Sequence, residues 1–486
     1  MHESGTPLSS SAPRADRPPP SPDAERTWSP ERRSVEFVPH QARYGRSRSL
    51  FTLWFGANMQ VTTIAAGALN VSIGLSLGWA LLSVLVGNLT GAVFMALHSA
   101  QGPRLGIPQM IQSRAQFGYV GAILPLVLVL LMYLGFFATT GVQGGQALAG
   151  WSGMPASPAM ILVSTAILIA AIFGYRLIHA MQKWVSLLSC IAFAYLTVRL
   201  LTAGDLAAAW QHQHVTAGSF LLGTALAATW QITYAPYVAD YSRYLPQHTS
   251  IKSTYWYTYA GSVLASCWMM AFGVLAAAVA PSSFDGGSVE FIVHQSQGDY
   301  GVFYAVILLG IVGINSLNLY GIFMATTSIV TALTPLRVGP RSRALIITLA
   351  ASAGTTVGLS ASSDFLGNFL NFILLLAYFL IPWTAINLAD FYLVRKETYD
   401  IPSIFDPAGR YQGVDLRTAT AYAVGVATEL PFVNSGFYVG PLVAPLGGAD
   451  ISWCIGLVTS GAAYVFLMRR FTRAGDGKLM AATSSN

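Results

Sequence analysis

The segment of residues 51–75 constrains the fold most, because it has the length of a membrane span and a polar centre. At about 1.5 Å per residue, an apolar helix of this length crosses a hydrocarbon core of about 30 Å. Its middle nevertheless carries Gly56, Asn58, Gln60 and Thr62. An unpaired polar group in lipid costs several kcal/mol, so such a centre is tolerated only against protein or a water-filled cavity. We therefore expect an interrupted helix beside a transport path.

The composition supports a protein with many membrane spans. The 486 residues are 54% hydrophobic and only 9% charged, whereas an average soluble domain has about 25% charged residues. The net charge of +6 does not indicate nucleic acid as a partner, because the basic residues lie between apolar runs and form no patch. These values predict an all-α integral membrane protein.

Twelve apolar segments follow residue 49. Their approximate limits are 50–75, 77–98, 119–148, 158–175, 180–202, 216–241, 255–280, 301–333, 343–361, 365–391, 418–436 and 450–468. If the first residues lie inside the cell, only Arg199 of the 26 Lys and Arg residues falls on the outer side. Positive charge collects on the cytoplasmic side of membrane proteins, so this alternation predicts twelve spans with both termini cytoplasmic. The expected location is the plasma membrane.

The sixth span, residues 217–241, resembles the first in construction. Pro236 has no N–H and its ring crowds the preceding turn, so the carbonyl of Ile232 loses its helical partner. Trp230 and Gln231 lie beside this weak point. Spans one and six open two successive sets of five, and interrupted helices at corresponding positions indicate a secondary transporter with inverted repeats and a midplane site. The alternative is a proline kink in a structural helix.

Seven segments carry a resemblance to a known family. They are WFGANMQ at 54–60, GPRLGIPQMIQSRAQFG at 102–118, GVQGGQAL at 141–148, YVADYSRYLP at 237–246, INSLNLY at 314–320, FLNFILLLAYFLIPWTAINLADFYLVRK at 369–396 and GGADISW at 447–453. In this order they resemble the nucleobase:cation symporter family, in its purine-cytosine permease branch, over residues 53–470. The resemblance implies a LeuT-type fold of five-plus-five inverted repeats with two added C-terminal helices, and alternating access driven by a cation gradient.

This organisation predicts six regions in the chain. They are a disordered cytoplasmic tail at 1–49, rich in Ser, Pro and Arg, five-helix repeats at 50–202 and 216–391, a cytoplasmic loop at 392–417, two additional helices at 418–470 and a cytoplasmic tail at 471–486. A tail of that composition lacks the apolar residues that would fold it.

The chemistry expected of the site is that of a neutral planar ring. Such a ring needs flat apolar faces and amide-like groups at its edge. Trp230 with Phe137 or Tyr133 would supply faces, and the edge amides would be Gln60, Gln231, Asn315 and Asn318. The middles of spans one, three, six and eight carry no charged residue, which disfavours a charged substrate. An unwound first helix could still hold an amino-acid carboxylate on its free N–H groups.

The resemblance implies a role for each of these residues. Gln60 would hydrogen-bond the edge of the substrate, and Trp230 or Gln231 would occupy the stacking position in span six. Asn315 would lie next to substrate and cation, and Asn318 matches the second Asn of the fungal permeases. For each amide the alternative is an interhelical hydrogen bond.

The coupling cation is where the sequence departs from sodium-dependent relatives. The resemblance places the ion on the carbonyls of Gly56 and Met59, together with paired hydroxyls of span eight. At those hydroxyl positions this chain has Gly313 and Ile314, which offer no side-chain oxygen. We therefore expect proton symport, with sodium as the alternative.

Span three departs from the same pattern. Sodium-dependent relatives often place an aromatic residue and a Gln around YLGFF, and here Phe137 replaces the Gln. Further edge contacts would then come from Gln143 or Gln146.

A proton needs an acceptor, and few residues qualify. Asp240 and Asp390 end spans six and ten, where ion pairs or helix-end roles are the alternative. Glu429 lies deeper, and an intramembrane carboxyl is a functional candidate by default. Arg104 and Arg114 belong to a short inner helix that would act either in gating or as an interfacial anchor.

Three classes of function were compared. An enzyme is disfavoured because the sequence has no HExxH motif, serine elbow or clustered His, and we expect no metal and no cofactor. A channel would more naturally show repeated filter segments or charged rings, although it remains the alternative class. We expect a symporter that imports cytosine or a purine, with allantoin, a hydantoin or a vitamin-type heterocycle as alternative substrates.

Overall fold

The computed structural model describes residues 35–471 apart from 174, 204–205, 212–213 and 335–338. Residues 1–34 of the predicted tail at 1–49 and residues 472–486 of the predicted tail at 471–486 therefore lie outside it. Within the described part, helices are joined by loops, and the loop between α17 and α18 contains an isolated antiparallel bridge between Asn434 and Val439. The helices are α1 Arg48–Ala57, α2 Val61–Ser72, α3 Leu77–Leu105, α4 Gln109–Phe117, α5 Ile123–Ser152, α6 Ala156–Phe173, α7 Tyr175–Ala203, α8 Leu206–Gln211, α9 Ala217–Ile232, α10 Ala235–Ser242, α11 Ile251–Val279, α12 Pro281–His294, α13 Tyr300–Leu333, α14 Pro340–Ala361, α15 Phe365–Ala389, α16 Ile401–Phe405, α17 Leu416–Glu429 and α18 Ser452–Arg470.

Each of the twelve predicted spans corresponds to one helix or to a consecutive pair. Six segments of the described chain are long and apolar enough by themselves to cross a membrane. Two predicted limits were wrong. Span two continues through buried residues to Leu105 and ends at Gly106, whose φ of 66° is left-handed. Span eleven is shorter than predicted, because α17 ends at Glu429 and a single 3₁₀ turn containing Pro431 follows it.

The first and sixth spans are both interrupted, as the sequence predicts. The first divides into α1 and α2 at residues 58–60, where Gln60 is extended with φ −144° and ψ 153°. The sixth divides into α9 and α10 at Thr233 and Tyr234, just before Pro236. Pro236 lies in the first turn of α10, where its missing N–H would have no helical partner. Each interruption is therefore local, with regular helix on both sides.

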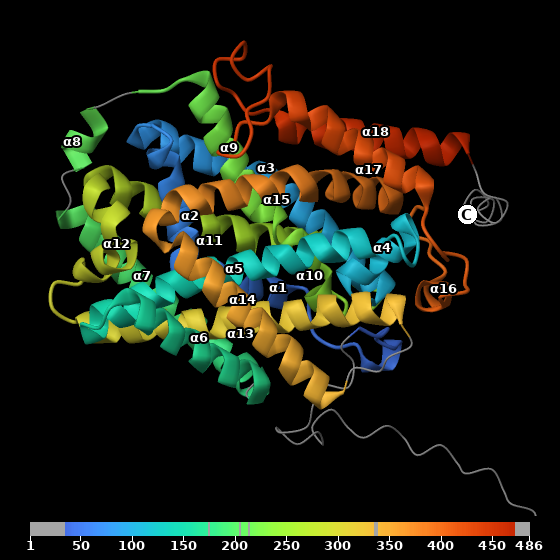
Figure 1. The fold of residues 1–486 in the computed structure, drawn as a ribbon, viewed down its shortest axis with the longest axis horizontal. Coiled ribbons are helices and arrows are strands. Elements are labelled where there is room, and N and C mark those ends of the chain that lie inside the picture. Colours follow the sequence, from blue (N-terminus) through green and yellow to red (C-terminus); the bar gives the residue numbers. More distant parts are fainter. Residues whose placement is uncertain (1–34, 174, 204–205, 212–213, 335–338, 472–486) are drawn as a thin grey trace, which may run out of the picture. The chain divides into compact units, whose positions relative to one another are not determined.

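The packing partners of the helices exchange between the two halves of the chain. Helix α3 of the first half packs on α9 of the second half, and α11 of the second half packs on α1 and α2 of the first half. In the same way α5 packs on α14, and α13 packs on α6. The helices α5 and α13, which correspond under this exchange, pack along each other (Figure 1). This exchange is the packing expected of two inverted five-helix repeats.

Small residues bring the interrupted helices close to their neighbours. A Cβ atom at Gly91 of α3 would collide with the carbonyl of Ala228 in α9. A Cβ atom at Gly273 of α11 would collide with the carbonyl of Ile64 in α2. Without side chains at these positions the backbones approach closely, which is how many membrane helices associate. The two contacts hold α2 and α9 against opposite partners of one bundle.

The two additional helices lie along α15. Helix α17 packs on α18, and both contact α15 (Figure 1). The hydroxyl of Tyr422 in α17 donates to the carbonyl of Phe379 in α15 at 3.1 Å. From α18, the hydroxyl of Tyr464 donates to Asp390 at 2.7 Å. These bonds fix the last two helices to the final helix of the second repeat.

Candidate functional site

Asn58 connects the two interrupted helices. Its Oδ1 accepts hydrogen bonds from Trp230 Nε1 at 2.9 Å and from the Tyr234 hydroxyl at 3.0 Å. Its Nδ2 donates to the carbonyl of Trp54 at 2.9 Å and to Ser262 Oγ at 3.2 Å. The side chain is fully buried. Sequence reasoning missed this role, because Asn58 and Gln60 are similar amides two residues apart in the same break.

Aromatic rings line this connection. Phe136 of α5 meets the Trp230 ring edge-on, with centroids 5.8 Å apart and planes at 87°. Tyr234 meets Trp230 in the same way at 6.0 Å. The neighbouring Phe137 points elsewhere, since a Cβ atom at Gly354 of α14 would collide with its ring. The ring that α5 presents to Trp230 is therefore Phe136, one residue before the predicted Phe137.

Tyr133, the other predicted face, lies one turn earlier in α5. Its ring covers Gly321 of α13, where a Cβ atom would collide with it, and stacks at a tilt on Tyr237 at 5.6 Å. Tyr133 therefore joins α5 to α13 and to α10.

Gln60 begins α2 as its N-cap residue. Its Nε2 donates to the carbonyl of Ala57 at 3.0 Å, and the residue is only partly buried. Gln60 lies directly after the break that Asn58 connects to Trp230. The structure thus places Gln60 and Trp230 on the two interrupted helices at the same junction.

Gln231 has a different environment from Trp230. Its Nε2 donates to Asn88 Oδ1 at 2.8 Å and to Ser266 Oγ at 2.5 Å, and its Oε1 accepts from Ser262 Oγ at 2.6 Å. The residue is fully buried between α3 and α11. Every polar atom of this amide therefore has a protein partner, as in the interhelical alternative.

Asn315 and Asn318 lie one turn apart on α13. Asn318 Nδ2 donates to Asn315 Oδ1 at 2.9 Å, and Asn315 Nδ2 donates to the carbonyl of Phe137 at 3.1 Å. Asn315 is fully buried, whereas Asn318 is 8% exposed. Asn315 therefore joins α13 to α5 and orients the more accessible Asn318.

Gln143 of α5 faces the start of α2. Thr62 Oγ1 donates to its Oε1 at 2.5 Å, and Thr140 lies beside Thr62 with their hydroxyls 3.4 Å apart. The Nε2 of Gln143 is buried without a partner among the described residues. Gln146, one turn on, accepts from Ser288 Oγ at 3.5 Å. Of these two amides, only Gln143 contacts an interrupted helix.

The positions considered for sodium show a turn of ordinary geometry. The carbonyl of Gly56 accepts from the backbone N–H of Met59 at 3.1 Å. On α13, Gly313 is buried, and the hydroxyl of Ser316 donates back to the carbonyl of Val312 at 2.7 Å. The hydrogen of this hydroxyl is therefore engaged within its own helix. In the described part of the chain, no group of three His, Cys, Asp or Glu residues is arranged to hold a metal ion.

With this geometry in place, the chain can be compared with known proteins. The family of permeases for cytosine/purines, uracil, thiamine and allantoin matches residues 37–456. The chain belongs to this family. It is therefore a membrane transporter of the nucleobase:cation symporter type and not an enzyme.

Relatives with similar sequences support the family assignment. The permease is 44% identical over 439 residues to YxlA of Bacillus subtilis, provisionally named as a purine-cytosine permease, covering 90% of this chain and 96% of that one. It is 28% identical over 459 residues to the purine-cytosine permease fcyB of Emericella nidulans, covering 90% and 88% of the two chains.

The fold is that of Mhp1, a nucleobase-cation-symport-1 family transporter. The inward-facing conformation of Mhp1 superimposes with a TM-score of 0.74 at 17% identity, over 94% of this chain and 98% of Mhp1. This match confirms the predicted all-helical, LeuT-type transporter fold.

The short helix α4 of the permease is buried along its whole length. All nine residues of α4 are buried, although five of them are polar, namely Gln109, Gln112, Ser113, Arg114 and Gln116. Arg114 is therefore not an interfacial anchor, and its guanidinium lies over the ring of Tyr119 at 4.2 Å. Burial lowers the pKa of Arg114. Arg104 is more exposed and pairs with Glu397 at 3.4 Å.

Asp390 is the centre of a buried network at the end of α15. Its carboxylate accepts from Arg395 Nε at 3.0 Å, from the hydroxyls of Tyr399 and Tyr464, and from Gln116 Nε2 at 2.8 Å. Burial alone would lower the pKa of Arg395, but the Asp390 carboxylate outweighs it and raises this pKa. Burial and the same carboxylate raise the pKa of Tyr399. The network is the ion-pair role that sequence reasoning considered for Asp390.

The two carboxyls predicted as proton acceptors or gates lie apart from the interruptions. Asp240 Oδ1 accepts from the backbone N–H of Gln109 at 2.7 Å, which satisfies the first residue of α4. Glu429 is 1% exposed at the end of α17, with both oxygens unpartnered among the described residues. It packs against Gly456 of α18, where a Cβ atom would collide with Oε1.

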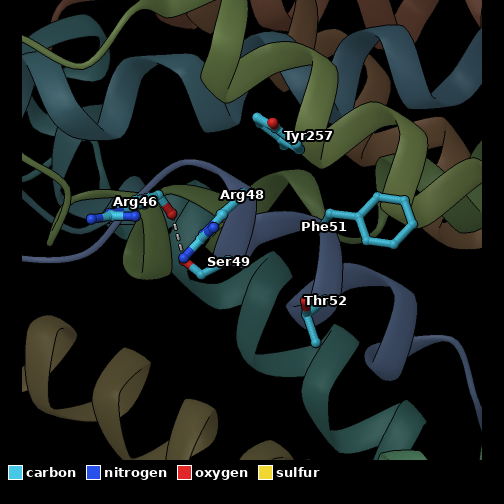
Figure 2. Close-up of a pocket in the computed structure, with 6 residues that line it drawn as sticks. All are labelled: Arg46, Arg48, Ser49, Phe51, Thr52 and Tyr257. Carbon is cyan, nitrogen blue, oxygen red and sulfur yellow. Dashed lines mark hydrogen bonds between the residues drawn. The ribbon is translucent and has the colours of Figure 1, made fainter.

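A pocket of about 540 Å³ lies at the start of α1, and Figure 2 shows the side chains that line it. Its lining residues are Arg46, Arg48, Ser49, Phe51, Thr52 and Tyr257, none of which is a predicted substrate-binding residue. Ser49 Oγ donates to the carbonyl of Arg46 at 2.8 Å. Two guanidinium groups suit an anion better than a neutral ring, so this pocket is distinct from the candidate substrate site.

Proposed function

We propose that the permease imports a neutral nucleobase, cytosine or a purine, by proton symport and alternating access. The observation that carries the proposal is the junction where Asn58 ties both interruptions to Trp230 and Tyr234. The junction offers aromatic faces and the amide of Gln60, which suit an uncharged ring. The name of fcyB, a purine-cytosine permease, and the provisional name of YxlA support the same substrate class.

Three of the predicted residues are our candidates for direct contact with the substrate. We assign Trp230 to one face of the ring, and Gln60 and Asn318 to its edge, because Gln60 is only partly buried and Asn318, at 8% exposed, is more accessible than Asn315. Asn315, Phe137 and Gln231 support these contacts from behind, since their polar atoms or rings are already held by other helices. The support is geometric, and substitution at each position tests it.

We propose the proton as coupling ion because the sodium site inferred from relatives has lost side-chain oxygens. Sodium would need more oxygens than the Gly56 and Met59 carbonyls supply. Gly313 and Ile314 offer none from their side chains, and Ser316 is turned back on its own helix. Proton coupling also needs no coordination cage.

The proposed orientation places both termini in the cytoplasm and the permease in the plasma membrane. In this orientation Arg104, Arg114 and Arg395 lie on the cytoplasmic side, as the distribution of positive charge favours. Labelling of single cysteines introduced beside Arg104 and Arg199 in intact cells tests it, because a membrane-impermeant reagent should reach only the second.

Reconstituted vesicles test the function itself. With an inward proton gradient and no sodium, labelled cytosine or adenine should accumulate above its outside concentration. Equilibration without accumulation under any ion gradient would indicate a channel and refute the symporter. Strict dependence on sodium would refute only the choice of ion. If allantoin, a hydantoin or vitamin B6 inhibited uptake more strongly than unlabelled cytosine or adenine, the proposed substrate class would be wrong.

A further inference from the structure

A second polar cluster lies inside the permease, away from the interrupted helices. Its centre is His98 of α3, which is fully buried and stacks flat on Trp383 of α15, with centroids 5.0 Å apart and planes at 4°. Nδ1 of His98 is 3.1 Å from Nε2 of Gln109 in α4. The nucleobase site described above makes no use of these residues.

The hydrogen bonds of the cluster are unbalanced around Gln109. Its Nε2 faces three acceptors, which are His98 Nδ1 and Gln101 Oε1 at 3.1 Å and Gln112 Oε1 at 3.3 Å. An amide nitrogen has two hydrogens, so one acceptor is always short of a donor. At the same time Gln109 Oε1 and His98 Nε2 have no partner among the described residues. The cluster could therefore take up one further hydrogen.

The cluster continues along α15 towards Asp390. Gln101 Nε2 donates to Asn387 Oδ1 at 2.9 Å, while Asn387 Nδ2 and Thr384 Oγ1 are buried without partners in the described part of the chain. Buried polar atoms of this kind are usually satisfied by ordered water, which needs two to four polar neighbours. Donors and acceptors both occur here, as a path for protons requires.

The cluster lies between the candidate substrate site and the cytoplasmic end of the proposed orientation. His98 follows Asn88, the partner of Gln231, by ten residues, or about 15 Å along α3. Beyond it, α4 is connected to the interrupted sixth span, because Asp240 of α10 accepts the N–H of Gln109. Gln109 thus contacts His98 through its side chain and the sixth span through its backbone.

The charged groups of the surrounding helices have partners of their own. Asp240 of α10 accepts a bond from the backbone of α4. Asp390, directly after α15, binds Arg395 and Tyr464 of α18. Arg114 of α4 lies over Tyr119. Among the described contacts, the polar partner of His98 is the amide of Gln109.

From this geometry we infer that His98 binds the coupling proton and thereby releases α4. This inference rests on the proposed proton symport. In neutral His98, Nδ1 accepts from Gln109 and Nε2 carries the hydrogen. A hydronium ion donates its proton to Nδ1 and leaves as water, the bond from Gln109 Nε2 breaks, and the amide turns its unpartnered Oε1 towards the new N–H. The amide nitrogen then leaves Gln101 of α3 and Gln112 of α4 itself. The contact between α4 and Gln101 is lost, α4 shifts on α3 about its remaining bond to His98, and the cytoplasmic side opens. Loss of the proton to the cytoplasm restores the closed arrangement.

The test uses full-length permease in vesicles and the variant His98→Gln, which keeps hydrogen bonding but cannot take up a proton at neutral pH. Wild type should accumulate labelled cytosine under an inward proton gradient. His98→Gln should lose at least 10-fold of this accumulation and of the exchange of inside for outside cytosine, because α4 is not released, while it binds cytosine within about 2-fold of wild type. The control His294→Gln changes a His of α12 whose ring lies beside Tyr300 at a tilt of 54°, and it should behave as wild type.

Cytosine binding shows that a variant is folded, and His98→Asn serves if His98→Gln does not bind. The second readout is the proton uptake that accompanies cytosine binding to purified permease in weak buffer, which should vanish in the His98 variant. If a His98 variant accumulated cytosine under a proton gradient as well as wild type does, the role of His98 would be overturned but the proposed coupling ion would not. Wild type that ignores the proton gradient would overturn both this inference and the proposed coupling ion.

Discussion

Replacing Asn58 with Ala tests the junction of the two interruptions most directly. The change removes the acceptor shared by Trp230 Nε1 and the Tyr234 hydroxyl, at 2.9 and 3.0 Å. Interhelical hydrogen bonds in membranes average about 0.6 kcal/mol and reach about 1.7. Two lost bonds therefore correspond to about 1–3 kcal/mol. If Trp230 must be held in place to stack on the substrate, the dissociation constant for cytosine should rise about 5- to 150-fold.

A second background separates the two bonds. Phe at position 230 has no ring N–H, so of the two bonds that Asn58 accepts, Asn58→Ala in a Trp230→Phe permease removes only the one from Tyr234, while the bonds donated to Trp54 and Ser262 are lost in both backgrounds. The loss of cytosine-binding free energy caused by Asn58→Ala should then fall by about half, because the effects of substitutions at two residues that share a hydrogen bond are not additive. Asn70→Ala is the matched control. Asn70 is as buried as Asn58 and binds Gly67 and Ser83, but it touches neither interruption.

Equilibrium binding of labelled cytosine to purified protein measures these changes. Asn58→Ala with the affinity of Asn70→Ala, or with the same penalty in both backgrounds, would show that Trp230 does not depend on Asn58.

Four other substitutions test the remaining assignments. Gln60→Ala and Asn318→Ala should each weaken cytosine binding by about 1–3 kcal/mol, the usual cost of an unpaired buried group; unchanged binding in both would refute the edge contacts. Glu429→Gln should keep proton-driven uptake and thermal stability, because neither carboxyl oxygen loses a described partner; loss of coupling would instead make Glu429 the proton acceptor. Asp390→Asn leaves Arg395 buried without its anion, so unfolding should become easier by about 3–5 kcal/mol, whereas Asp364→Asn at the exposed cap of α15 should change little in the same thermal-unfolding assay.

Much of the fold was predictable, because membrane helices obey strong rules on length, charge and backbone pairing. The polar centre around Gln60 and the proline at 236 indicated the two interruptions, and both are present. The limit of span eleven was missed, because apolar residues continue past Glu429 although Pro431 ends the regular helix. Hydropathy reports where a chain is apolar, and helix ends depend on local backbone chemistry.

The side chains of the site were less predictable than the helices. Whether Phe136 or Phe137 meets Trp230 depends on a rotation of about 100° per residue around α5, which apolar sequence on all sides does not define. The full burial of α4 was also missed, since QMIQSRAQF is too polar to suggest it. Its spacing did hold a signal. Gln109, Ser113 and Gln116 share one helical face, and the last two bind Trp383 and Asp390 of α15.

The polarity of α4 has a consequence for the speed of transport. If α4 carried leucine side chains instead, exposing them to water when the cytoplasmic side opens would cost about 25 cal/mol per Å². Gln and Ser side chains instead exchange hydrogen bonds to protein for hydrogen bonds to water at little net cost in free energy. In the inferred mechanism, a polar α4 closes the cytoplasmic side without adding a large apolar cost to its opening. The opening step therefore need not limit the rate of transport.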